Sequence, residues 1–479
     1  MSKSANFTSD ELSAYDVHGI APVPVSHRTS SPLDQFWIWA GANVAPINWV
    51  LGALGIQMGL SLWDTFLVIA IGNLVGAALF ATFCLMGYRT GVPQMVLTRL
   101  AFGRRGAYLP TFVQLLMAMG WVATNTWIVL DLSVAALDRM GIGGGMEVKY
   151  AIALVIMVVQ IGIAAWGFNA IKYFERYTMP AILLIMVAMT FMASFTVDIQ
   201  WSTSTVTGIA RWSAMSQLMT AIGIGWGISW LVYASDYTRF SNPGLKPSSV
   251  FKATFLGMFV PTVWLATLGA AIASAGVGSD PAQLIIAAFG VMALPVLLVL
   301  VHGPIATNIV VIYSAALSSL AMDINKPRWV VSLACGVAGS IILYGFMQSQ
   351  DFAHAFETFM VTMVVWISPW AGVTAADFFV MRRGSINVDE LYKPHTTSRL
   401  GDVNWTGVLS LLVGVFAAYL FQMSVVEVLQ GPLALGLGGI DLSWLAGFVV
   451  AFMAYIVSHK LRRTADVGAS ALTLPVRGE

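Results

Sequence analysis

The chain has 479 residues, of which 58% are hydrophobic and only 10% are charged. Soluble domains carry about 25% charged residues, so this composition excludes an ordinary soluble protein and predicts a polytopic membrane protein. The formal net charge of +1 gives no indication of a nucleic-acid partner. The two cysteines, Cys84 and Cys335, lie in apolar runs, where buried inert thiols are expected rather than a disulfide or a metal site.

Apolar runs long enough for a membrane-spanning helix, which needs roughly 20 residues, recur along the whole chain. We count twelve of them, at about 34–57, 62–86, 109–137, 148–167, 178–196, 214–234, 250–275, 291–318, 329–348, 355–380, 405–424 and 442–459. The first 32 residues are polar, show no cleavable signal peptide and are expected to form a loose tail. An even number of crossings predicts that both termini lie on one side.

The basic residues predict which side that is. If the N-terminus is inside, the outer segments hold only three of the 24 basic residues, Arg139, Lys149 and Arg211. Cytoplasmic loops of membrane proteins are enriched in Lys and Arg. We therefore expect a multi-pass protein of the inner (plasma) membrane with both termini in the cytoplasm.

Two connections between the runs have helical patterns of their own. Val92–Arg105 has apolar residues at helical spacing between basic ones and is expected to lie on the inner face of the membrane. Pro281–Phe289, on the outer side, is either an ordinary loop helix or a cap over an outer vestibule.

The first apolar run is interrupted near its middle by Asn43, Pro46 and Asn48. Pro46 has no N–H and strains a helix, and lipid cannot satisfy the two amides. Irregular backbone at this depth is tolerated only where protein or a wet cavity covers it. The run is therefore either a broken helix that lines a polar site or a kinked helix whose amides bond to neighbouring helices.

The sixth run carries three glycines, Gly223, Gly225 and Gly227, each of which weakens a helix by about 1 kcal/mol relative to alanine. A small-residue packing face is the alternative interpretation. However, the cluster lies five elements after the first interruption and in the opposite orientation. Interruptions at corresponding places in two halves predict an inverted-repeat transporter.

The predicted fold class is an all-α polytopic membrane protein with 12 transmembrane helices. Broken helices 1 and 6 open two inverted repeats of five helices each, and two extra helices follow at the C-terminus. The expected divisions are an N-terminal cytoplasmic tail at 1–32, repeats at 33–196 and 197–383, a cytoplasmic loop at 384–404, helices 11 and 12 at 405–459, and a C-terminal tail at 460–479.

Polar and aromatic residues of other helices reach the depth of the two interruptions. Trp121 and Asn125 are four residues apart and share a helical face. The eighth run brings His302, Gly303, Thr307 and Asn308 to the same level. No Asp, Glu, Lys or Arg lies within one turn of these positions along the chain, whereas an anionic substrate would need a cation or a free helix N-terminus.

This combination predicts a neutral, flat heterocycle as the ligand. Trp121 and Trp226 offer faces on which a ring can stack, although most of the 17 tryptophans are expected to pack against lipid or core. Asn43 and Asn125 each offer a donor and an acceptor that match the edge of a base.

Several short motifs, in order, carry a family resemblance. They are Phe102–Ala107 (FGRRGA) before the third run, Asp236–Arg239 (DYTR) after the sixth, Asp377–Arg383 (DFFVMRR) closing the tenth, Asp389–Tyr392 (DELY) and Val403–Trp405 (VNW). Together they resemble the nucleobase–cation symporter-1 family, which includes purine–cytosine, uracil and allantoin permeases and hydantoin transporters. The resemblance implies the inverted-repeat fold that this family shares with sodium-coupled amino-acid transporters.

The resemblance also implies roles for individual residues. Substrate binding falls on Trp121, Asn125, Asn43 and the pair Gly225 and Trp226. A cation site falls on the backbone carbonyls of Trp39 and Ala42, with Gly303, Ala306 and Thr307. Sodium-binding members have two adjacent hydroxyls where this chain has Ala306 and Thr307, so one oxygen ligand is missing.

The coupling ion can therefore be Na⁺ or H⁺, and the chain offers candidates for proton binding or gating in His302, Asn308 and Asp236. A histidine within a membrane titrates near neutral pH and suggests a functional role. The alternative for His302 is a neutral ring bonded to a neighbouring helix.

The sequence thus predicts a monomeric, cation-coupled secondary active importer of a nucleobase or related planar heterocycle, with purines and cytosine favoured, which works by alternating access. No cofactor other than the coupling ion is expected. A transporter of the same fold for allantoin, hydantoin, a vitamin-precursor pyrimidine or an amino acid is the alternative. A channel or a membrane-embedded enzyme is not expected, since only His302 among the usual catalytic groups lies at this depth.

Overall fold

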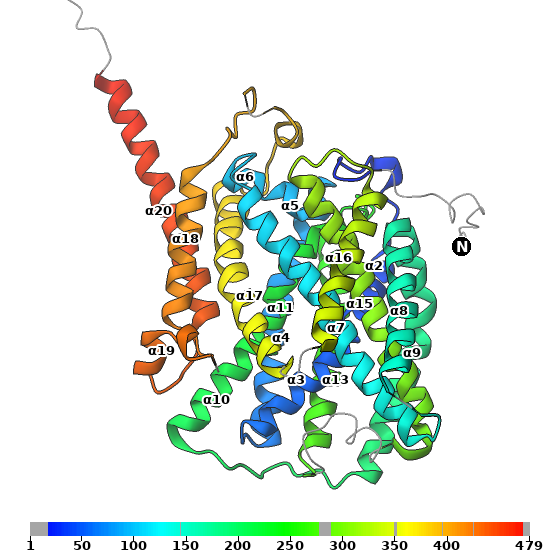
Figure 1. Cartoon of the computed structure of the whole chain (residues 1–479). Coiled ribbons are helices and arrows are strands. Elements are labelled where there is room, and N and C mark those ends of the chain that lie inside the picture. The colour runs from blue at the N-terminus through cyan, green and yellow to red at the C-terminus, as the bar shows by residue number, and fades with distance from the viewer. Residues whose placement is uncertain are drawn as a thin grey trace, which may run out of the picture.

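The structure, a computed structural model, describes residues 18–143, 145–276, 289–348, 352–394, 396–424 and 426–472. Its long helices run side by side in one bundle (Figure 1). Within the described residues, ten helices are long and apolar enough to cross a membrane, and Ile47–Gln57 and Trp405–Leu420 are apolar but shorter. Each of the twelve predicted runs lies mainly on helical residues, while the number of membrane crossings stays a prediction.

The long helices have the following bounds. They are α2 (Pro32–Asn43), α3 (Pro46–Gln57), α4 (Leu62–Thr90), α7 (Tyr108–Arg139), α8 (Met146–Trp166), α9 (Phe168–Thr196), α10 (Gly208–Ala221), α13 (Pro247–Ala273), α15 (Ala293–Ala321), α16 (Arg328–Gln348), α17 (Phe352–Ala375), α18 (Trp405–Leu420) and α20 (Ser443–Leu472). Shorter pieces are α5 (Gln94–Leu97), α6 (Arg99–Phe102), α11 (Ile224–Ser229), η2 (Leu231–Tyr233), α12 (Ala234–Thr238), a π-helical turn (Ala376–Met381) and α19 (Pro432–Gly436).

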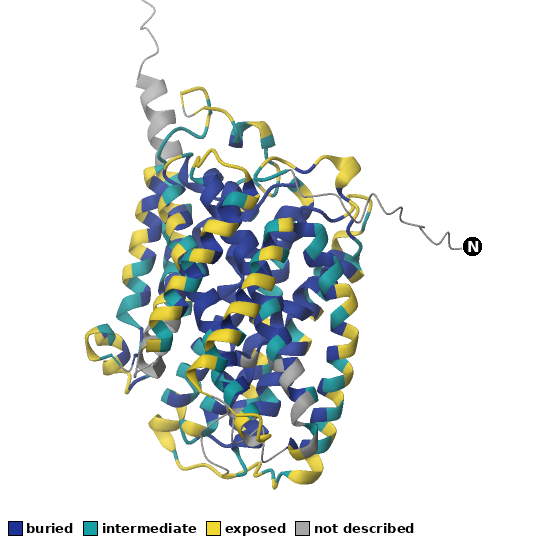
Figure 2. Cartoon of the chain, turned by 45° about the vertical axis from the view of Figure 1, so that its right-hand side comes forward, coloured by how far each residue is buried: buried dark blue, intermediate teal, exposed yellow. Residues whose placement is uncertain are grey.

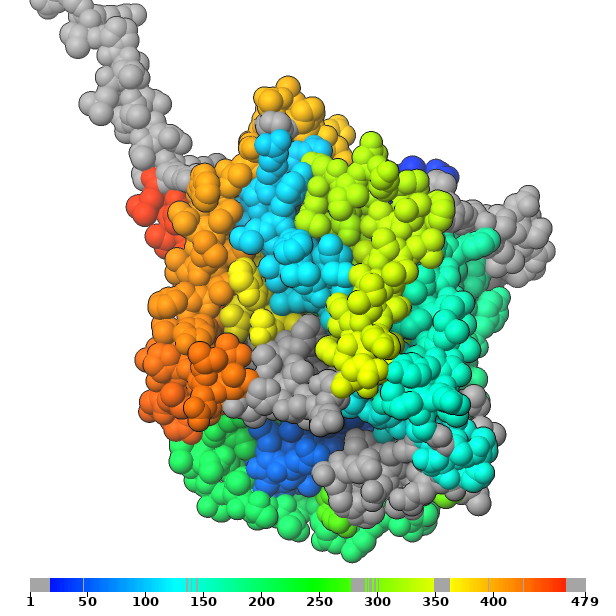
Figure 3. All heavy atoms as spheres, in the orientation of Figure 1, coloured from blue at the N-terminus to red at the C-terminus, as the bar shows by residue number. Residues whose placement is uncertain are grey.

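Burial divides the helices into an inner and an outer set. Residues 222–240, which include α11 and α12, and the part of α15 from Val301 to Ala321 are almost wholly enclosed, whereas α8, α9, α16 and α20 expose one side (Figure 2). The exposed side carries large apolar residues such as Leu184, Phe195 and Ile341. Since lipid solvates apolar side chains but not backbone groups, this arrangement suits a bundle surrounded by a bilayer. Figure 3 shows α7 and α16 meeting in a continuous outer surface.

Both predicted interruptions are present. Helix α2 ends at Asn43 and α3 begins at Pro46, with Ala45 in an extended conformation between them. Helix α10 ends at Ala221 and α11 begins at Ile224, with Gly223 in a non-helical conformation. The first run is therefore broken rather than merely kinked. The exact division into two repeats stays a prediction.

The second broken helix packs tightly on α4 through facing glycines. A Cβ built on Gly227 would lie 2.3 Å from the carbonyl carbon of Gly76, so the two backbones touch where a side chain would otherwise stand. This close approach makes Gly227 part of a packing face, while Gly223 lies at the break itself. The two interpretations that the sequence leaves open therefore both apply, to different glycines of the cluster.

Residues 18–31 are ordered across one end of the bundle, which we call the N-terminal face. The N–H of Val23 donates to the carbonyl of Gly91 at 2.9 Å, and that of Ser30 donates to Phe240 at 3.0 Å. The guanidinium of Arg28 donates to the carbonyls of Ser241 and Tyr88. The expectation of a loose tail is therefore wrong for this part, because the backbone of residues 18–31 finds partners in the bundle.

Three further boundaries differ from expectation. Val92–Arg105 does form short helices, α5 and α6, but residues 92–103 are buried in protein instead of lying on a membrane surface. Helix α9 begins at Phe168 rather than 178, which brings the charged residue Glu175 into a helix. Helix α20 continues to Leu472 rather than ending at 459. The predicted piece Pro281–Phe289 lies outside the described residues except for Phe289.

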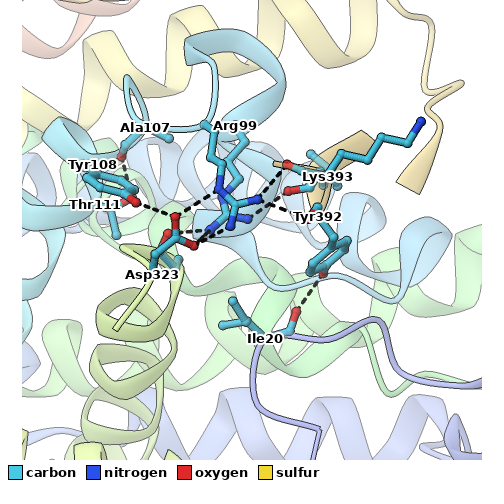
Figure 4. A network of polar contacts seen from close by, with 11 residues as sticks. Ile20, Arg99, Ala107, Tyr108, Thr111, Asp323, Tyr392 and Lys393 are labelled. Carbon is cyan, nitrogen blue, oxygen red and sulfur yellow. Dashed lines mark hydrogen bonds and ion pairs between the residues drawn. The ribbon is translucent and has the colours of Figure 1, made fainter. Parts of the chain in front are cut away.

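Asp323, between α15 and α16, holds the N-terminal face together (Figure 4). Its carboxylate accepts hydrogen bonds from Arg104 at 2.8 and 3.0 Å, from Arg99 at 3.2 Å and from the hydroxyl of Tyr108 at 2.5 Å. Partial burial opposes ionisation, but the hydrogen bonds from Arg104 and Tyr108 and the charge of Arg99 hold the pKa of Asp323 below its ordinary value. The network closes this end of the bundle across α6, α7 and α15.

Replacing Gly227 with alanine tests the contact between α4 and α11. The added methyl group must displace the backbone of Gly76, and overpacking of this kind costs roughly 1–3 kcal/mol. We expect a lower thermal unfolding temperature in detergent, measured by the loss of monodisperse protein on heating. Gly345→Ala is the matched control, since a Cβ there meets nothing within 4 Å. Equal unfolding temperatures for the two variants would refute the tight contact.

Replacing Asp323 with asparagine tests the network on the N-terminal face. A carboxylate whose folded-state pKa is depressed stabilises the fold above its unfolded pKa of about 3.9, and this stabilisation is lost as the pH falls through the folded value. We expect Asp323→Asn to lower the unfolding temperature at pH 7 and to flatten its decline below pH 4. Asp402→Asn, which removes an exposed pair with Arg105, is the control and should change little. The role of the network is contradicted if both variants behave alike.

Candidate functional site

A narrow cavity lies between the second broken helix and the helices α7 and α15. Its lining residues are Trp121 and Asn125 of α7, Trp226, Ser229, Trp230 and Tyr233 of the broken segment, and Thr307 and Val311 of α15. The empty space amounts to about 250 Å³, but it is narrow, and a water-sized sphere fits at little more than one place. No charged side chain belongs to this lining within the described part of the chain.

The aromatic rings of the cavity stand edge to face. The rings of Trp121 and Trp226 are 5.9 Å apart at 83°, and those of Trp226 and Trp230 are 6.2 Å apart at 69°. Perpendicular rings in contact leave no room for a base between them. A planar guest can instead stack on one indole and meet the edge of the other, so the two faces predicted for stacking cannot both be used at once in this conformation.

Asn125 points one side of its amide away from the cavity. Its Nδ2 donates to Oδ1 of Asn308 at 3.2 Å, and the Nδ2 of Asn308 donates in turn to the carbonyl of Val122, to Thr126 and to Gln160. None of the described residues donates to Oδ1 of Asn125. The cavity therefore presents an acceptor at Asn125, while Asn308 serves as the support that orients it.

Asn43 lies behind the cavity wall and not in it. Its Oδ1 accepts hydrogen bonds from the indole Nε1 of Trp226 at 2.8 Å and from Thr262 at 3.1 Å, and its Nδ2 donates to the carbonyl of Trp39 at 2.8 Å. Asn43 thus fixes the Trp226 ring. Direct contact between Asn43 and a base would require these bonds to break.

Gly225 is likewise outside the lining. A Cβ on Gly225 would lie 1.7 Å from the carbonyl oxygen of Thr220, so glycine is what allows α11 to start against the last turn of α10. Its role in this conformation is to shape the break that carries Trp226.

Asparagine amides satisfy the carbonyl groups that each break leaves open. Nδ2 of Asn48 donates to the carbonyl of Asn43 at 2.7 Å, and Nδ2 of Asn73 on α4 donates to the carbonyl of Ile222 at 2.7 Å. Backbone groups inside a membrane need such partners. The part played by Asn73 was not predicted, although an amide in the middle of an apolar run is a signal for it.

The residues expected to bind sodium lie where α2 crosses α15, but their oxygens are engaged. Oγ1 of Thr307 donates to the carbonyl of Ala42 at 2.9 Å, and the carbonyl of Trp39 accepts from Asn43. Gly303 and Ala306 are buried and supply no side-chain oxygen. Sodium favours several hard oxygen ligands, so this donor set does not fit sodium in this conformation.

Of the three candidates for proton binding or gating, Asn308 supports Asn125 behind the cavity lining, whereas His302 and Asp236 lie apart from the cavity. Nε2 of His302 is 2.8 Å from Oγ1 of Thr178, and its ring stacks on Phe174 at 5.4 Å. The carboxylate of Asp236 accepts from the backbone N–H of Gln94 at 2.8 Å, near the N-terminal face. His302 is thus bonded to a neighbouring helix, and Asp236 ties the broken helix to α5.

A carboxyl group does lie beside the first break, contrary to the expectation of a charge-free region. Glu175 of α9 is buried, and a Cβ built on Gly41 would lie 1.7 Å from its Oε2. The expectation failed because it counted neighbours along the chain, whereas Glu175 reaches Gly41 from a different helix.

The lining also contains residues that sequence reasoning missed: Ser229, Trp230, Tyr233 and Val311. Two of them had a usable signal, since Trp230 lies four residues after Trp226 and Val311 four residues after Thr307, on the same helical faces. Ser229 and Tyr233 had none, because their places depend on how the broken segment turns.

Comparison with known proteins identifies relatives over nearly the whole chain. The putative purine-cytosine permease YxlA of Bacillus subtilis is 24% identical over 454 residues, which cover 92% of this chain and 95% of that protein. The purine-cytosine permease FCY2 of Saccharomyces cerevisiae is 24% identical over 487 aligned positions, which cover 93% of this chain and 86% of the relative.

Solved structures show the same fold. Mhp1, a nucleobase-cation-symport-1 family transporter, in a closed conformation with bromovinylhydantoin bound, has a TM-score of 0.75 and 18% identity, covering 92% of this chain and 95% of that chain. Inward-facing Mhp1 has a TM-score of 0.68, with 93% of each chain covered. The family model described as permeases for cytosine and purines, uracil, thiamine and allantoin matches residues 22–447. The chain therefore belongs to the nucleobase–cation symporter-1 family, a family of permeases rather than of enzymes.

Proposed function

We propose that this permease is a cation-coupled secondary active importer of nucleobases, with purines and cytosine as the favoured substrates. The observation that carries the proposal is the cavity beside the second break, which combines aromatic rings, an amide acceptor and no charged lining among the described residues. The purine-cytosine permeases among its relatives support the same choice of substrate.

The binding mode that the geometry favours places the base on the face of Trp121, with its edge toward the acceptor of Asn125. Trp226 then meets the base edge-on, because the two indoles are perpendicular. The narrow cavity must widen to admit a ring, and turning Trp226 would loosen its bond to Asn43. Substrate entry and the conformation of the first break are therefore linked.

The alternative substrates differ in charge, and the cavity lining can be compared with each. Allantoin, hydantoin and vitamin-precursor pyrimidines are neutral and planar or nearly so, and the bromovinylhydantoin bound to Mhp1 belongs to this chemical class. An amino acid carries a carboxylate and an ammonium group, which the described lining offers no charged partner to hold. Purines and cytosine remain our preferred substrates over these.

The proposed orientation places the N-terminal face and both termini in the cytoplasm of a plasma membrane, in a monomer. The basic residues support this orientation, since Arg99 and Arg104 both pair with Asp323 there, and Arg104 lines a pocket with residues 18–21. One positive charge that moves inward through ~100 mV releases about 2.3 kcal/mol, which supports roughly 50-fold accumulation of a neutral base. A single coupled ion thus suffices for uptake from dilute solution.

An uptake screen in proteoliposomes tests the proposed function. Radiolabelled adenine, hypoxanthine, cytosine, uracil and allantoin are presented with sodium and pH varied separately. Saturable uptake of purines and cytosine, with each base competing against the others, is the expected result. Uptake confined to allantoin, or a ligand-independent ion current, would overturn the proposal.

Replacing Trp121 with alanine tests the stacking surface. Stacking of a base on an aromatic side chain is worth about 1–3 kcal/mol, so we expect loss of measurable uptake at micromolar base and an apparent affinity weakened by about 5- to 150-fold. The exposed Trp212 of α10 supplies the control, since Trp212→Ala removes an indole of the same size far from the lining. Unchanged transport by folded Trp121→Ala protein would remove Trp121 from the site.

A further inference from the structure

Glu175 carries a carboxyl group that lies in the protein interior without a hydrogen-bond partner. Its exposed fraction is 0%, and none of the described residues bonds to Oε1 or Oε2. Burying an ionised carboxylate without a partner is very costly. In this conformation the group therefore needs a bound cation or a proton.

The carboxyl group sits against the half-helix that ends at the first break. It occupies the space that a Cβ on Gly41 would fill, since that Cβ would lie 1.7 Å from Oε2. The contact is two residues before α2 ends at Asn43 and one residue before Ala42, which is bonded to Thr307. Only a residue without a side chain at position 41 lets α2 and α9 enclose the carboxyl group in this way.

Helix geometry places Glu175 at the depth of the α2–α15 crossing. Thr178 of α9 contacts His302 of α15 at 2.8 Å. Glu175 lies three residues, about 4.5 Å, closer to the N-terminal face than Thr178, and Thr307 lies five residues, about 7.5 Å, closer than His302. Glu175 and Thr307 thus reach a similar level.

Other ionisable groups of the elements packed against α9 have partners or lie elsewhere. On α2, Asp34 caps its own helix through Ser31 and lies 3.9 Å from Arg176. On α15, His302 is bonded to Thr178. On α9 itself, Lys172 lies over the rings of Phe168 and Tyr173. On α8, Glu147 and Lys149 are near the opposite end of the bundle, where Lys149 pairs with Asp131.

The surroundings of Glu175 suit a proton better than sodium. The nearby oxygens that sodium would require are the carbonyl of Ala42, which already accepts from Thr307, and a second hydroxyl, which Ala306 does not supply. A proton needs no coordination shell and no extra space. A proton bound to Glu175 therefore accounts for both observations, the donor set that does not fit sodium and the carboxyl group without a partner.

We propose that Glu175 is the residue that carries the coupling proton of this permease, an inference that rests on the proposed base transport. The carboxylate binds a proton from the outside and becomes a neutral carboxylic acid, which α2 and α9 can enclose. When it releases the proton to the other side, the charged carboxylate requires water, and α2 must part from α9. Because the break frees α2 from α3, α2 can move without dragging the rest of helix 1.

The same half-helix connects the proton to the substrate. Asn43 at the end of α2 holds the indole of Trp226, which forms the wall of the cavity. A base that repositions Trp226 therefore acts on α2, and so does the charge of Glu175. Two ligands that bias one mobile element are coupled by thermodynamic necessity.

Proteoliposomes with a proton gradient test this assignment. With the membrane potential clamped at zero and no sodium present, one pH unit directed inward supports at most about tenfold accumulation through one coupled proton. We expect the wild type to accumulate labelled adenine or cytosine toward this limit. Glu175→Gln should only equilibrate the base, while its exchange of internal for external base persists. Glu175→Asp, which keeps an ionisable group, should retain accumulation with a shifted pH dependence.

Two controls separate Glu175 from general effects. Glu147→Gln makes the same chemical change at an exposed position, and His302→Gln removes the rival ionisable group at the α9–α15 contact. Both are expected to accumulate base as the wild type does. Loss of accumulation in His302→Gln with retention in Glu175→Gln would overturn the assignment.

Other results also decide the matter. Accumulation by Glu175→Gln equal to that of the wild type, or accumulation by the wild type driven by sodium alone, overturns the proposal. If the wild type exchanges no base at all, the proposed function fails, and this inference fails with it.

Should Glu175→Gln not fold, infrared spectra of the wild type and Glu175→Asp at pH 7 replace the transport measurement on that variant. A band of a protonated carboxylic acid that shifts in the aspartate variant is expected, and absence of the band overturns the proposal.

Discussion

The structure depends on how it satisfies backbone groups that two broken helices leave open in an apolar interior. At each break an asparagine amide donates to a backbone carbonyl of the break, from Asn48 to Asn43 and from Asn73 to Ile222. The side chain of Asn43 then links both breaks, because it accepts from Trp226 of the second while it belongs to the first. Without these amides, several polar groups would be buried without partners, and each such group costs about 1–3 kcal/mol.

The breaks and the cavity are consequently parts of one arrangement. The break before α11 turns Trp226, Ser229 and Trp230 toward α7 and α15, and a bond across to the other break fixes the first of these rings. The half-helix α2 ends in that same bond and also rests on Glu175. A short, separately movable helix therefore contacts the substrate wall at its tip and an ionisable group along its side. This is the physical basis on which binding and conformation can be coupled.

The positions of the breaks could be predicted because their causes are local. Pro46 stands between Asn43 and Asn48, and Gly223 begins a run of three glycines in five residues, and these local combinations predict the interruptions. A proline alone does not, since Pro180, Pro261, Pro304 and Pro369 lie inside continuous helices. Trp121, Asn125, Trp226 and Thr307 could also be placed at the cavity, since helical period and depth in the membrane decide which face and level they occupy.

The predictions that failed concern residues whose positions depend on contacts between segments far apart in the sequence. Asn43 was expected to face the base, but the sequence does not reveal that the indole N–H of Trp226 competes for its oxygen. Glu175 lies between the predicted apolar runs 148–167 and 178–196, whereas α9 begins ten residues earlier than expected, at Phe168 instead of 178. Its proximity to Gly41 is a fact of tertiary packing. Ser229 and Tyr233 could not be placed because the path of the broken segment depends on its packing against α4 and α17.

The division of labour among the polar residues has a consequence for how this architecture can diversify. Asn43, Asn48 and Asn73 maintain the scaffold from behind the wall, whereas Ser229, Tyr233 and Val311 touch the empty space without bonding either break's terminal carbonyl. Substitutions at Ser229, Tyr233 or Val311 can change the shape of the cavity while the hydrogen bonds at the two breaks stay in place. A few side-chain substitutions in the cavity lining can thus change substrate specificity, while the broken helices that move during transport are retained.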